Sequence, residues 1–352
     1  MKTVAGDPIE TVAIARGPYR AELITLGAAL RRLEVPDRHG TPANVVLGFA
    51  DLEDYRGPPR FHGAVTGRYA NRIAGARFTL DGAEHRIAAN DGANSLHAGP
   101  LGLDQQFWEV VARSEASASF RHVSPAGHNG FPGRLTVEAH YAIEADGLGL
   151  RLTAFTDAPT VVNLTHHAYF NLAGEASGAS GATILDHLLR IPASRTTPID
   201  AGLIPTGMLA DVAGTPFDFR MPRRIGTGID ADDEQLRHGQ GYDHNFVIDA
   251  ASGALRRVAT LFDPGSGRVL DLHSGEPGLQ FYSGNHLAGG APGTSGQAYA
   301  ARAGLCLEPQ KFPDSPNRPD FPSARLDPGA LYRHDIAFRF RTANTRDEAF
   351  GA

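Results

Sequence analysis

Short segments of alternating apolar and polar residues recur along the chain and constrain its fold more than any other feature. Apolar side chains stand at every second position over residues 19–25, 135–143 and 336–340. This period is typical of β-strands with one buried face. Turn signals such as Asp81-Gly82 and Asp146-Gly147 separate the segments. The pattern predicts an all-β protein built as a large sandwich.

Helices have little room, because 41 Gly and 24 Pro are spread through the 352 residues and both types weaken helix interiors. We expect one short helix or turn over 231–237, with Asp230 as its N-cap. The glycine-rich segments 174–181 and 289–296 are interpreted as surface loops. Strands do not alternate with helices, which argues against a parallel α/β sheet. No repeat or linker divides the chain, so we expect a single domain over residues 1–352.

Composition limits the partners. The formal charge is −6 with 20% charged residues, so we expect neither nucleic acid nor a membrane surface as a partner. No segment has the apolar length of a signal peptide core or a membrane span, which predicts a soluble, cytoplasmic protein. Cys306 is the single cysteine, so no disulfide framework is expected, and we interpret it as a small core residue. A monomer and a homodimer both stay open.

One acid stands out within LCLEPQKFPDSPNRPDFP, residues 305–322. The apolar run 305–307 predicts a short buried strand, and the prolines from Pro309 onward predict a rigid, extended loop. Glu308 would then lie where the strand gives way to the loop, a good place to hold a base against a small substrate. The alternative is a strand-end acid with an arginine partner.

Two polar segments precede the middle of the chain. In GRYANRIAGAR, Arg72 beside Asn71 is a plausible clamp for vicinal hydroxyls, although a solvated hairpin with surface arginines has the same sequence signal. In NSLH, His97 lies next to a glycine-containing turn and could reach a cleft rim. Lone histidines are more often structural hydrogen-bonding residues than catalysts.

The segment TVVNLTHHAYFNLAG, residues 160–174, carries two adjacent histidines. In a strand, His166 and His167 would point to opposite faces, so only one can face a given cleft. Neighbours on opposite faces cannot chelate one ion, and no H-E-x-x-H sequence is present, so we expect no metal site. Structural packing of both histidines stays open as the alternative.

Two later segments add hydrogen-bonding groups. Asp243 in YDHNF precedes an apolar strand, where it could be a turn residue or accept hydrogen bonds from hydroxyls. Gln280 in LQFYSGN lies on an alternating strand and could point to the same cleft. Nucleotide, dinucleotide and serine-hydrolase motifs are absent. Acid, imidazole and amide groups on an all-β scaffold suit proton transfer on a polyol, and sugars fit best.

Seven segments in this order resemble the aldose 1-epimerase (mutarotase) family, and the likeness covers nearly the whole chain. They are LEVPDRHGTPANVVLGFADLEDY, GRYANRI, NSLHAGPLGLDQQFWEV, VVNLTHHAYFNLAG, YDHNFVID, LQFYSGNHL and LEPQKFPDSPNRPDFPSARLDPGALYRHDIAFRF. The resemblance implies a single large antiparallel β-sandwich with an open sugar cleft and no cofactor. It also implies interconversion of the α and β anomers of free aldohexoses, with galactose or glucose as the expected substrates.

The resemblance further implies a role for each matching residue. Glu308 matches the general base that takes the proton of the anomeric hydroxyl, and His167, two residues before Tyr169, matches the general acid for the ring oxygen. We expect His167 to start protonated and Glu308 ionised, each favoured by the charge of the other. The sugar-binding positions match Arg72, His97, Asp243 and Gln280, with Asn71 as their neighbour.

The chain departs from the family pattern at several positions. His166 stands where asparagine is usual and Pro309 where threonine is usual, and Pro309 and Lys311 beside the base could change which sugar fits. Two alternatives follow. A hexose-phosphate mutarotase would need a cationic pocket, for which Arg68, Arg72 and Arg77 are the visible cluster. A non-catalytic sugar-binding protein would keep the cleft without turnover.

Overall fold

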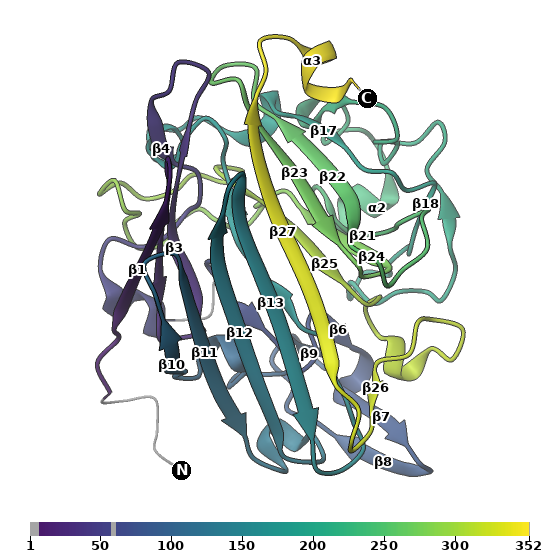
Figure 1. The fold of residues 1–352 in the computed structure, drawn as a ribbon. Helices are drawn as coiled ribbons and strands as arrows, with labels where there is room; N and C mark the ends of the chain where they lie inside the picture. The colour runs from purple at the N-terminus through teal and green to yellow at the C-terminus, as the bar shows by residue number, and fades with distance from the viewer. Residues whose placement is uncertain (1–6, 58–60, 352) are drawn as a thin grey trace.

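Three antiparallel sheets make up most of the computed structural model, which describes residues 7–57 and 61–351 (Figure 1). The largest sheet has nine strands in the order β10 (Glu109–Arg113), β11 (Ser117–Ser124), β12 (Leu135–Glu144), β13 (Gly147–Thr156), β27 (Tyr332–Thr342), β23 (Arg268–Ser274), β22 (Arg256–Phe262), β17 (Leu188–Arg190) and β20 (Arg223–Arg224). The all-β prediction is confirmed.

A six-stranded sheet lies behind the nine-stranded sheet in the view of Figure 1, and a four-stranded sheet covers one end. The six-stranded order is β16 (Tyr169–Phe170), β25 (Leu305–Gln310), β24 (Gly278–Tyr282), β21 (Asp243–Val247), β18 (Arg195–Thr196) and β19 (Ala210–Asp211). The four-stranded order is β1 (Thr11–Arg16), β2 (Tyr19–Ile24), β3 (Ala29–Pro36) and β4 (Pro42–Asn44).

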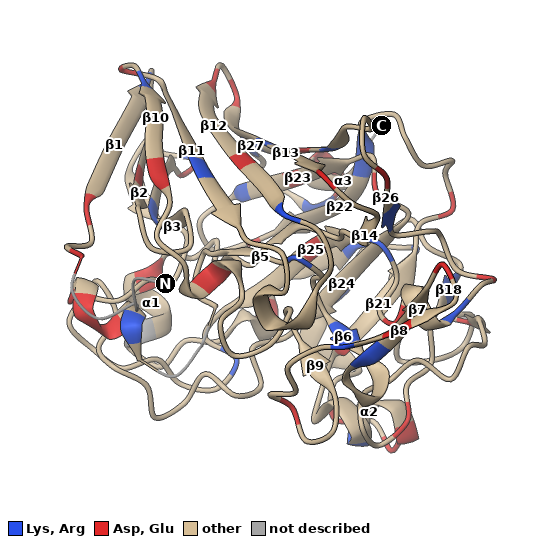
Figure 2. Ribbon diagram, turned by 90° about the horizontal axis from the view of Figure 1, so that it is seen from below, with Lys and Arg blue, Asp and Glu red and all other residues tan. Residues whose placement is uncertain are grey.

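Four two-stranded ladders complete the strand pairing of the described residues. They pair β5 (Val65–Thr66) with β15 (Thr165–His166), β6 (Arg72–Ile73) with β9 (Ser95–Leu96), β7 (Arg77–Leu80) with β8 (Ala83–Arg86), and β14 (Thr160–Val161) with β26 (Arg325–Leu326). Figure 2 shows β6 and β9 on the side of the six-stranded sheet that faces away from the nine-stranded sheet.

Helices are short. They are α1 (Glu175–Ala179), α2 (Glu234–Gly239) and α3 (Arg346–Phe350), with 3₁₀ turns at η1 (Leu52–Arg56), η2 (Ala74–Ala76), η3 (Leu103–Gln105), η4 (His128–Gly130), η5 (Ile184–Asp186), η6 (Ile225–Thr227) and η7 (Ser315–Asn317). Across the described residues, no helix has the length and apolar character needed to cross a membrane.

The predicted alternation is the basis of the core. In β12, the residues Leu135, Val137, Ala139, Tyr141 and Ile143 are buried, while the residues between them are half-buried or exposed. One apolar cluster takes side chains from all three sheets. The inward residues of the six-stranded sheet join this cluster, so the intervening residues of β21, β24 and β25 project to the other face of that sheet.

Three local predictions were wrong. The N-cap of α2 is Asp233, whose carboxylate accepts the backbone N–H groups of Gln235 and Leu236, while Asp230 forms an ion pair with Arg302 at 3.1 Å. The expected loop over 174–181 contains α1. The N-cap differs because Asp230, Asp232 and Asp233 stand close together and are all suitable caps. The helix α1 begins after Gly174 without a side-chain cap, so no capping signal marks it in the sequence.

The third wrong prediction concerns β25, the strand that carries Glu308. β25 does not end before Glu308 but continues to Gln310, with Glu308 opposite Gln280 and Pro309 opposite Leu279. On the other side, β16 pairs with Leu305 and Cys306, and farther along the carbonyl group of Pro309 accepts a hydrogen bond of 2.7 Å from the Thr165 hydroxyl. The partner there is a side chain that needs no backbone N–H from position 309, so a proline is tolerated in the strand.

Acidic and basic residues are interspersed over the fold (Figure 2). Most form local pairs, such as Arg121 with Glu138 at 2.8 Å and Arg151 with Asp335 at 2.7 Å. Interspersed charges of both signs produce no extended field of one sign. This distribution agrees with the expectation that the partner is a small molecule.

Candidate active site

A pocket of about 210 Å³ lies on the outward face of the six-stranded sheet. It is smaller than the roughly 300–1,000 Å³ typical of drug-sized ligands and suits a single small molecule. All seven site residues named from the sequence line it, although they come from segments far apart in the chain: Asn71, Arg72, His97, His167, Asp243, Gln280 and Glu308.

The floor of the pocket follows from strand register. Asn245 of β21 lies opposite Gln280 of β24, which lies opposite Glu308 of β25. Residues two apart share a face, so Asp243 projects to the same side as Asn245. There the Gln280 amide donates a hydrogen bond of 2.6 Å to the Asp243 carboxylate. The sheet therefore presents two carboxyl groups, Asp243 and Glu308, with an amide between them.

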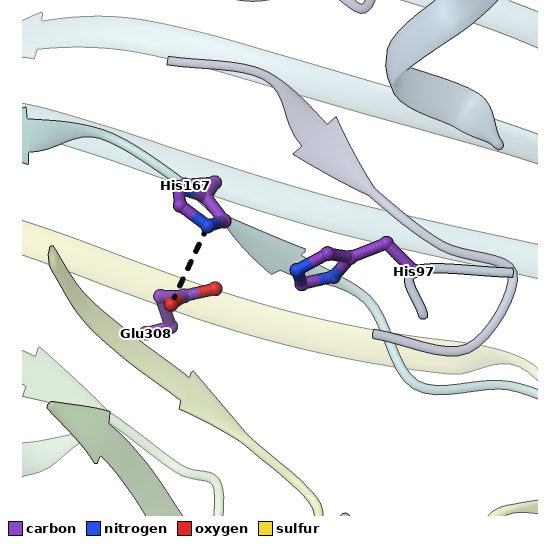
Figure 3. Close-up of side chains that lie close together, drawn as sticks. All are labelled: His97, His167 and Glu308. Atoms are coloured by element: carbon purple, nitrogen blue, oxygen red, sulfur yellow. Dashed lines mark ion pairs between the residues drawn. The ribbon is translucent and has the colours of Figure 1, made fainter. Parts of the chain in front are cut away.

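His167 lies directly after β15 and faces Glu308 (Figure 3). The distance from its Nε2 to the Glu308 Oε1 is 3.8 Å, and their side chains are only 6% and 3% exposed. His166 points the other way, between the core rings of Tyr141 and Phe338. The two histidines therefore lie on opposite sides, as the strand pattern predicts, and only His167 reaches the pocket.

Burial controls the charges of this pair. It raises the pKa of Glu308 well above its ordinary value, with the Asp243 carboxylate adding to the rise and Arg72 opposing it. Burial also lowers the pKa of His167 to about 4. These two shifts favour a protonated Glu308 and a neutral His167, which differs from the ionised pair expected from the sequence. Both arrangements contain the same single proton, on one partner or the other.

His97 forms the third corner of the group in Figure 3. Its Nδ1 accepts the backbone N–H of Asn71 at 3.1 Å. Burial, followed by His167 and Arg72, lowers the pKa of His97 well below its ordinary value, so the ring is neutral at pH 7 and carries its proton on Nε2. Asn71 has φ +65°, a left-handed conformation that asparagine tolerates. His97 is therefore a fixed hydrogen-bond donor.

The same group of side chains could be considered for a metal ion, because ligand atoms of His97, His167 and Glu308 lie within 4.8 Å of one another. A histidine ligand needs a free lone pair on the coordinating nitrogen. The lone pair on Nδ1 of His97 accepts the hydrogen bond from the backbone N–H of Asn71, and Nε2 carries the proton, so neither ring nitrogen has a free lone pair for a metal ion. The arrangement suits hydrogen bonding to a polar ligand better than three-fold metal ligation.

Arg72 is the one arginine among the lining residues identified for this pocket. Its Nε donates to the Asp91 carboxylate at 2.7 Å, which orients the guanidinium. Arg68 donates to carbonyl groups of residues 124, 125, 132 and 133, and Arg77 lies on an exposed hairpin 4.0 Å from Glu84. The three arginines therefore do not form the cationic cluster that a phosphate pocket would need.

Lys311 also lies elsewhere. It borders a larger groove of about 830 Å³ on the outer face of the nine-stranded sheet, where its ammonium pairs with the buried Glu276 at 3.1 Å. The other charges in that groove are also paired, as Asp335 is with Arg151 at 2.7 Å and Arg333 at 2.6 Å. A direct effect of Lys311 on a ligand in the 210 Å³ pocket is not supported by this geometry.

Several site residues were missed from the sequence. The Phe61 ring lies 4.5 Å from the ring of His97 and 5.3 Å from that of His167, a contact between distant segments that no local pattern predicts. Cys306, interpreted as a core residue, has its Sγ 3.4 Å from the His167 Nδ1. Its spacing of two from Glu308 was the available signal, because the two share a strand face.

Comparisons with known proteins agree over almost the full length. The family model described as aldose 1-epimerase matches residues 10–339. The chain is 42% identical to the galactose mutarotase of Bos taurus over 335 residues, 95% of each chain. It is 38% identical to the aldose 1-epimerase of Escherichia coli (strain K12) over 321 residues, 90% of this chain and 91% of that protein.

Solved structures show the same architecture. An aldose epimerase homologue from C. elegans superposes with a TM-score of 0.87 at 29% identity, covering 96% of this chain and 100% of the other. A galactose 1-epimerase from Lactobacillus acidophilus gives a TM-score of 0.80 at 25% identity, with coverages of 96% and 99%. The sandwich expected from the sequence is therefore shared with these proteins.

Proposed function

The chain belongs to the aldose 1-epimerase family of isomerases, and we propose that it interconverts the anomers of free aldohexoses, with galactose and glucose as the first candidates. The observation that carries the proposed chemistry is the His167–Glu308 pair, two buried proton-transfer groups whose Nε2 and Oε1 are 3.8 Å apart at a small polar pocket. This separation exceeds a direct hydrogen bond. Each group can therefore interact with a different oxygen of one sugar.

We assign Glu308 as general base and His167 as general acid. The bound sugar donates its anomeric O1–H to Glu308, and this hydrogen bond with the charge of Arg72 favours the carboxylate. The shared proton then resides on His167. Glu308 takes the O1 proton while His167 protonates the ring oxygen O5, the C1–O5 bond breaks, and C1 becomes an aldehyde carbon.

The reverse steps close the ring. After rotation about C1–C2, the O5 hydroxyl attacks the other face of the aldehyde, His167 recovers the proton from O5, and Glu308 returns its proton to O1. The active site regains its original protonation, so no co-reactant is needed. Arg72, His97, Asp243 and Gln280, with Asn71 beside them, would hold the remaining oxygens of the sugar.

The charge of the pocket supports a neutral substrate. Its lining carries two carboxyl groups, Asp243 and Glu308, and its lining arginine Arg72 is already paired with Asp91. A phosphate group would meet like charge and no free cation among these residues. The hexose-phosphate alternative is therefore less well supported than the free aldohexose.

The test is polarimetry on freshly dissolved α-D-galactose and α-D-glucose, after subtraction of the spontaneous rate. Positioned acid–base groups contribute roughly 10²–10⁴ each, so we expect Glu308→Gln and His167→Asn to lose at least about 100-fold in kcat. His166→Asn is the matched control, because its side chain faces the core, and it should keep most of the wild-type rate.

Other outcomes would change the proposal. Acceleration only with a hexose 6-phosphate would favour the phosphorylated-sugar enzyme. Saturable binding of free sugars without any gain in anomer exchange would identify a binding protein. Full activity in both pair variants would refute the assigned roles.

We also propose that the enzyme acts as a single domain in the cytoplasm. One apolar cluster joins all three sheets, and Cys306 is a free cysteine, which fits a reducing compartment. One chain supplies all seven side chains of the site. The proposed chemistry therefore needs no partner copy, whether the enzyme is a monomer or a homodimer.

A further inference from the structure

Cys306 is a buried polar group that the proposed mechanism does not use. It is fully buried and lies two residues before Glu308 on β25, so both side chains project to the pocket side of the sheet. Its Sγ is 3.4 Å from Nδ1 of His167, while Oε1 of Glu308 is 3.8 Å from Nε2 of the same ring. Two side chains of one strand thus bracket the imidazole.

We propose that Cys306 is a positioning residue whose sulfur accepts a hydrogen bond from the Nδ1–H of His167 and so leaves Nε2 as the nitrogen that exchanges protons. Its catalytic consequence rests on the proposed mutarotase function. The contact itself does not.

The requirement for Nδ1–H follows from proton accounting in the reaction. His167 is an imidazolium before it protonates the ring oxygen and a neutral imidazole afterwards. If Nε2 gives up the proton, Nδ1 keeps its own in both states. A buried N–H without an acceptor is costly. Among the hydrogen bonds of the described residues Cys306 is the side-chain partner of this nitrogen, and the backbone carbonyl of His167 itself opposes, less strongly than burial acts, the lowering of the pKa of its ring.

The choice of sulfur also matters. A thiol is a weak acceptor, whereas a carboxylate or carbonyl oxygen in its place would stabilise the imidazolium and raise the pKa of His167. Burial, with Glu308 and Asp243 adding to it, raises the pKa of Cys306, so the group stays a neutral thiol. His167 is thereby held in place yet stays a strong acid, which suits protonation of a weakly basic ring oxygen.

The test combines ¹⁵N NMR of the histidine side chains with kinetics, and His167→Asn assigns the His167 resonances. In the wild type at neutral pH we expect the Nδ1–H tautomer. Cys306→Ala should populate the Nε2–H tautomer and lower kcat about tenfold with KM within about twofold, less than the roughly 100-fold that a 1 Å misplacement can cost.

Two further variants separate positioning from packing. Cys306→Ser supplies a stronger acceptor, so it should retain the Nδ1–H tautomer and most of kcat. Because the stronger acceptor raises the pKa of His167, the fall of kcat on the acid side, where the pair takes up a second proton, should move to higher pH. Ile191→Val removes one methyl group from the main core and should change neither the tautomer nor kcat.

The proposal is overturned if wild-type His167 carries its neutral-state proton on Nε2, or if Cys306→Ala leaves both tautomer and kcat unchanged. If Cys306→Ala does not fold, Cys306→Ser decides through the tautomer and the acid limb. A wild type that turns over no sugar but has a Cys306-dependent Nδ1–H tautomer would refute the mutarotase function and uphold the contact.

Discussion

Replacing His166 by asparagine should remove a specific part of the acid sensitivity of the fold. His166 is 1% exposed between Tyr141 and Phe338. Neither of its ring nitrogens has a side-chain hydrogen bond within the described part of the chain. Burial, and secondarily the neighbouring His167, lowers its pKa from 6.5 to about 3. Folding therefore requires a neutral imidazole at this position.

The direction of the pH effect follows from linkage. A group whose pKa is lower in the folded state contributes stability above its unfolded pKa and loses it as the pH falls. At pH 5 an unfolded histidine with pKa 6.5 is about 97% protonated while the folded one is still neutral, which costs about 2 kcal/mol relative to pH 7.5. His166→Asn removes this contribution.

The assay is denaturant unfolding of wild type and His166→Asn at pH 7.5, 6.5, 5.5 and 5.0. Between the two extremes, the free energy of unfolding should fall by about 2 kcal/mol less in the variant. A constant offset from the new amide cancels in this comparison. Equal pH dependence in the two proteins would refute the reasoning, because it would mean that the folded protein accommodates a charged imidazole at this site.

Three other predictions concern the pocket and its surroundings. Asp243→Asn removes a carboxylate that raises the pKa of Glu308, so the alkaline limb of kcat, where the pair loses its shared proton, should move to lower pH; an unmoved limb would contradict this. Lys311→Met leaves Glu276 buried without its partner at 3.1 Å and should lower the free energy of unfolding by about 3 kcal/mol. The galactose-to-glucose preference should not change, and a changed preference would place Lys311 at the site. Arg72→Lys should raise KM about tenfold with little change in kcat, because it loses the planar fork, and an unchanged KM would argue against sugar contact.

Local pattern was sufficient for some structural features. Alternation gives the buried face of β12, and the same period of two places His166 in the core and His167 at the pocket. These predictions succeed because side-chain direction in a strand depends only on neighbouring residues. Motif resemblance indicated the family and grouped seven residues that the fold brings to one pocket.

Other features depend on pairing between distant segments. Prolines after Glu308 predicted the end of a strand, yet β24 keeps β25 paired through Pro309. The contact of the Phe61 ring with the rings of both His97 and His167 could not be predicted for the same reason. The burial that raises the pKa of Glu308 and lowers the pKa of His167 could not be predicted either, because it depends on how distant segments cover the pair.

The register of β24 and β25 has a consequence for how such a protein can change during evolution. Gln280 opposite Glu308 fixes which residues face the pocket, and a single-residue insertion or deletion within either strand would turn every side chain beyond it to the other face. A lost residue there would bury the base in the apolar core and expose Leu307 to the sugar. Length changes should instead accumulate in the surface connection over 288–298, which lies outside both strands, so an added or lost residue there does not change which side chains of β24 and β25 face the pocket.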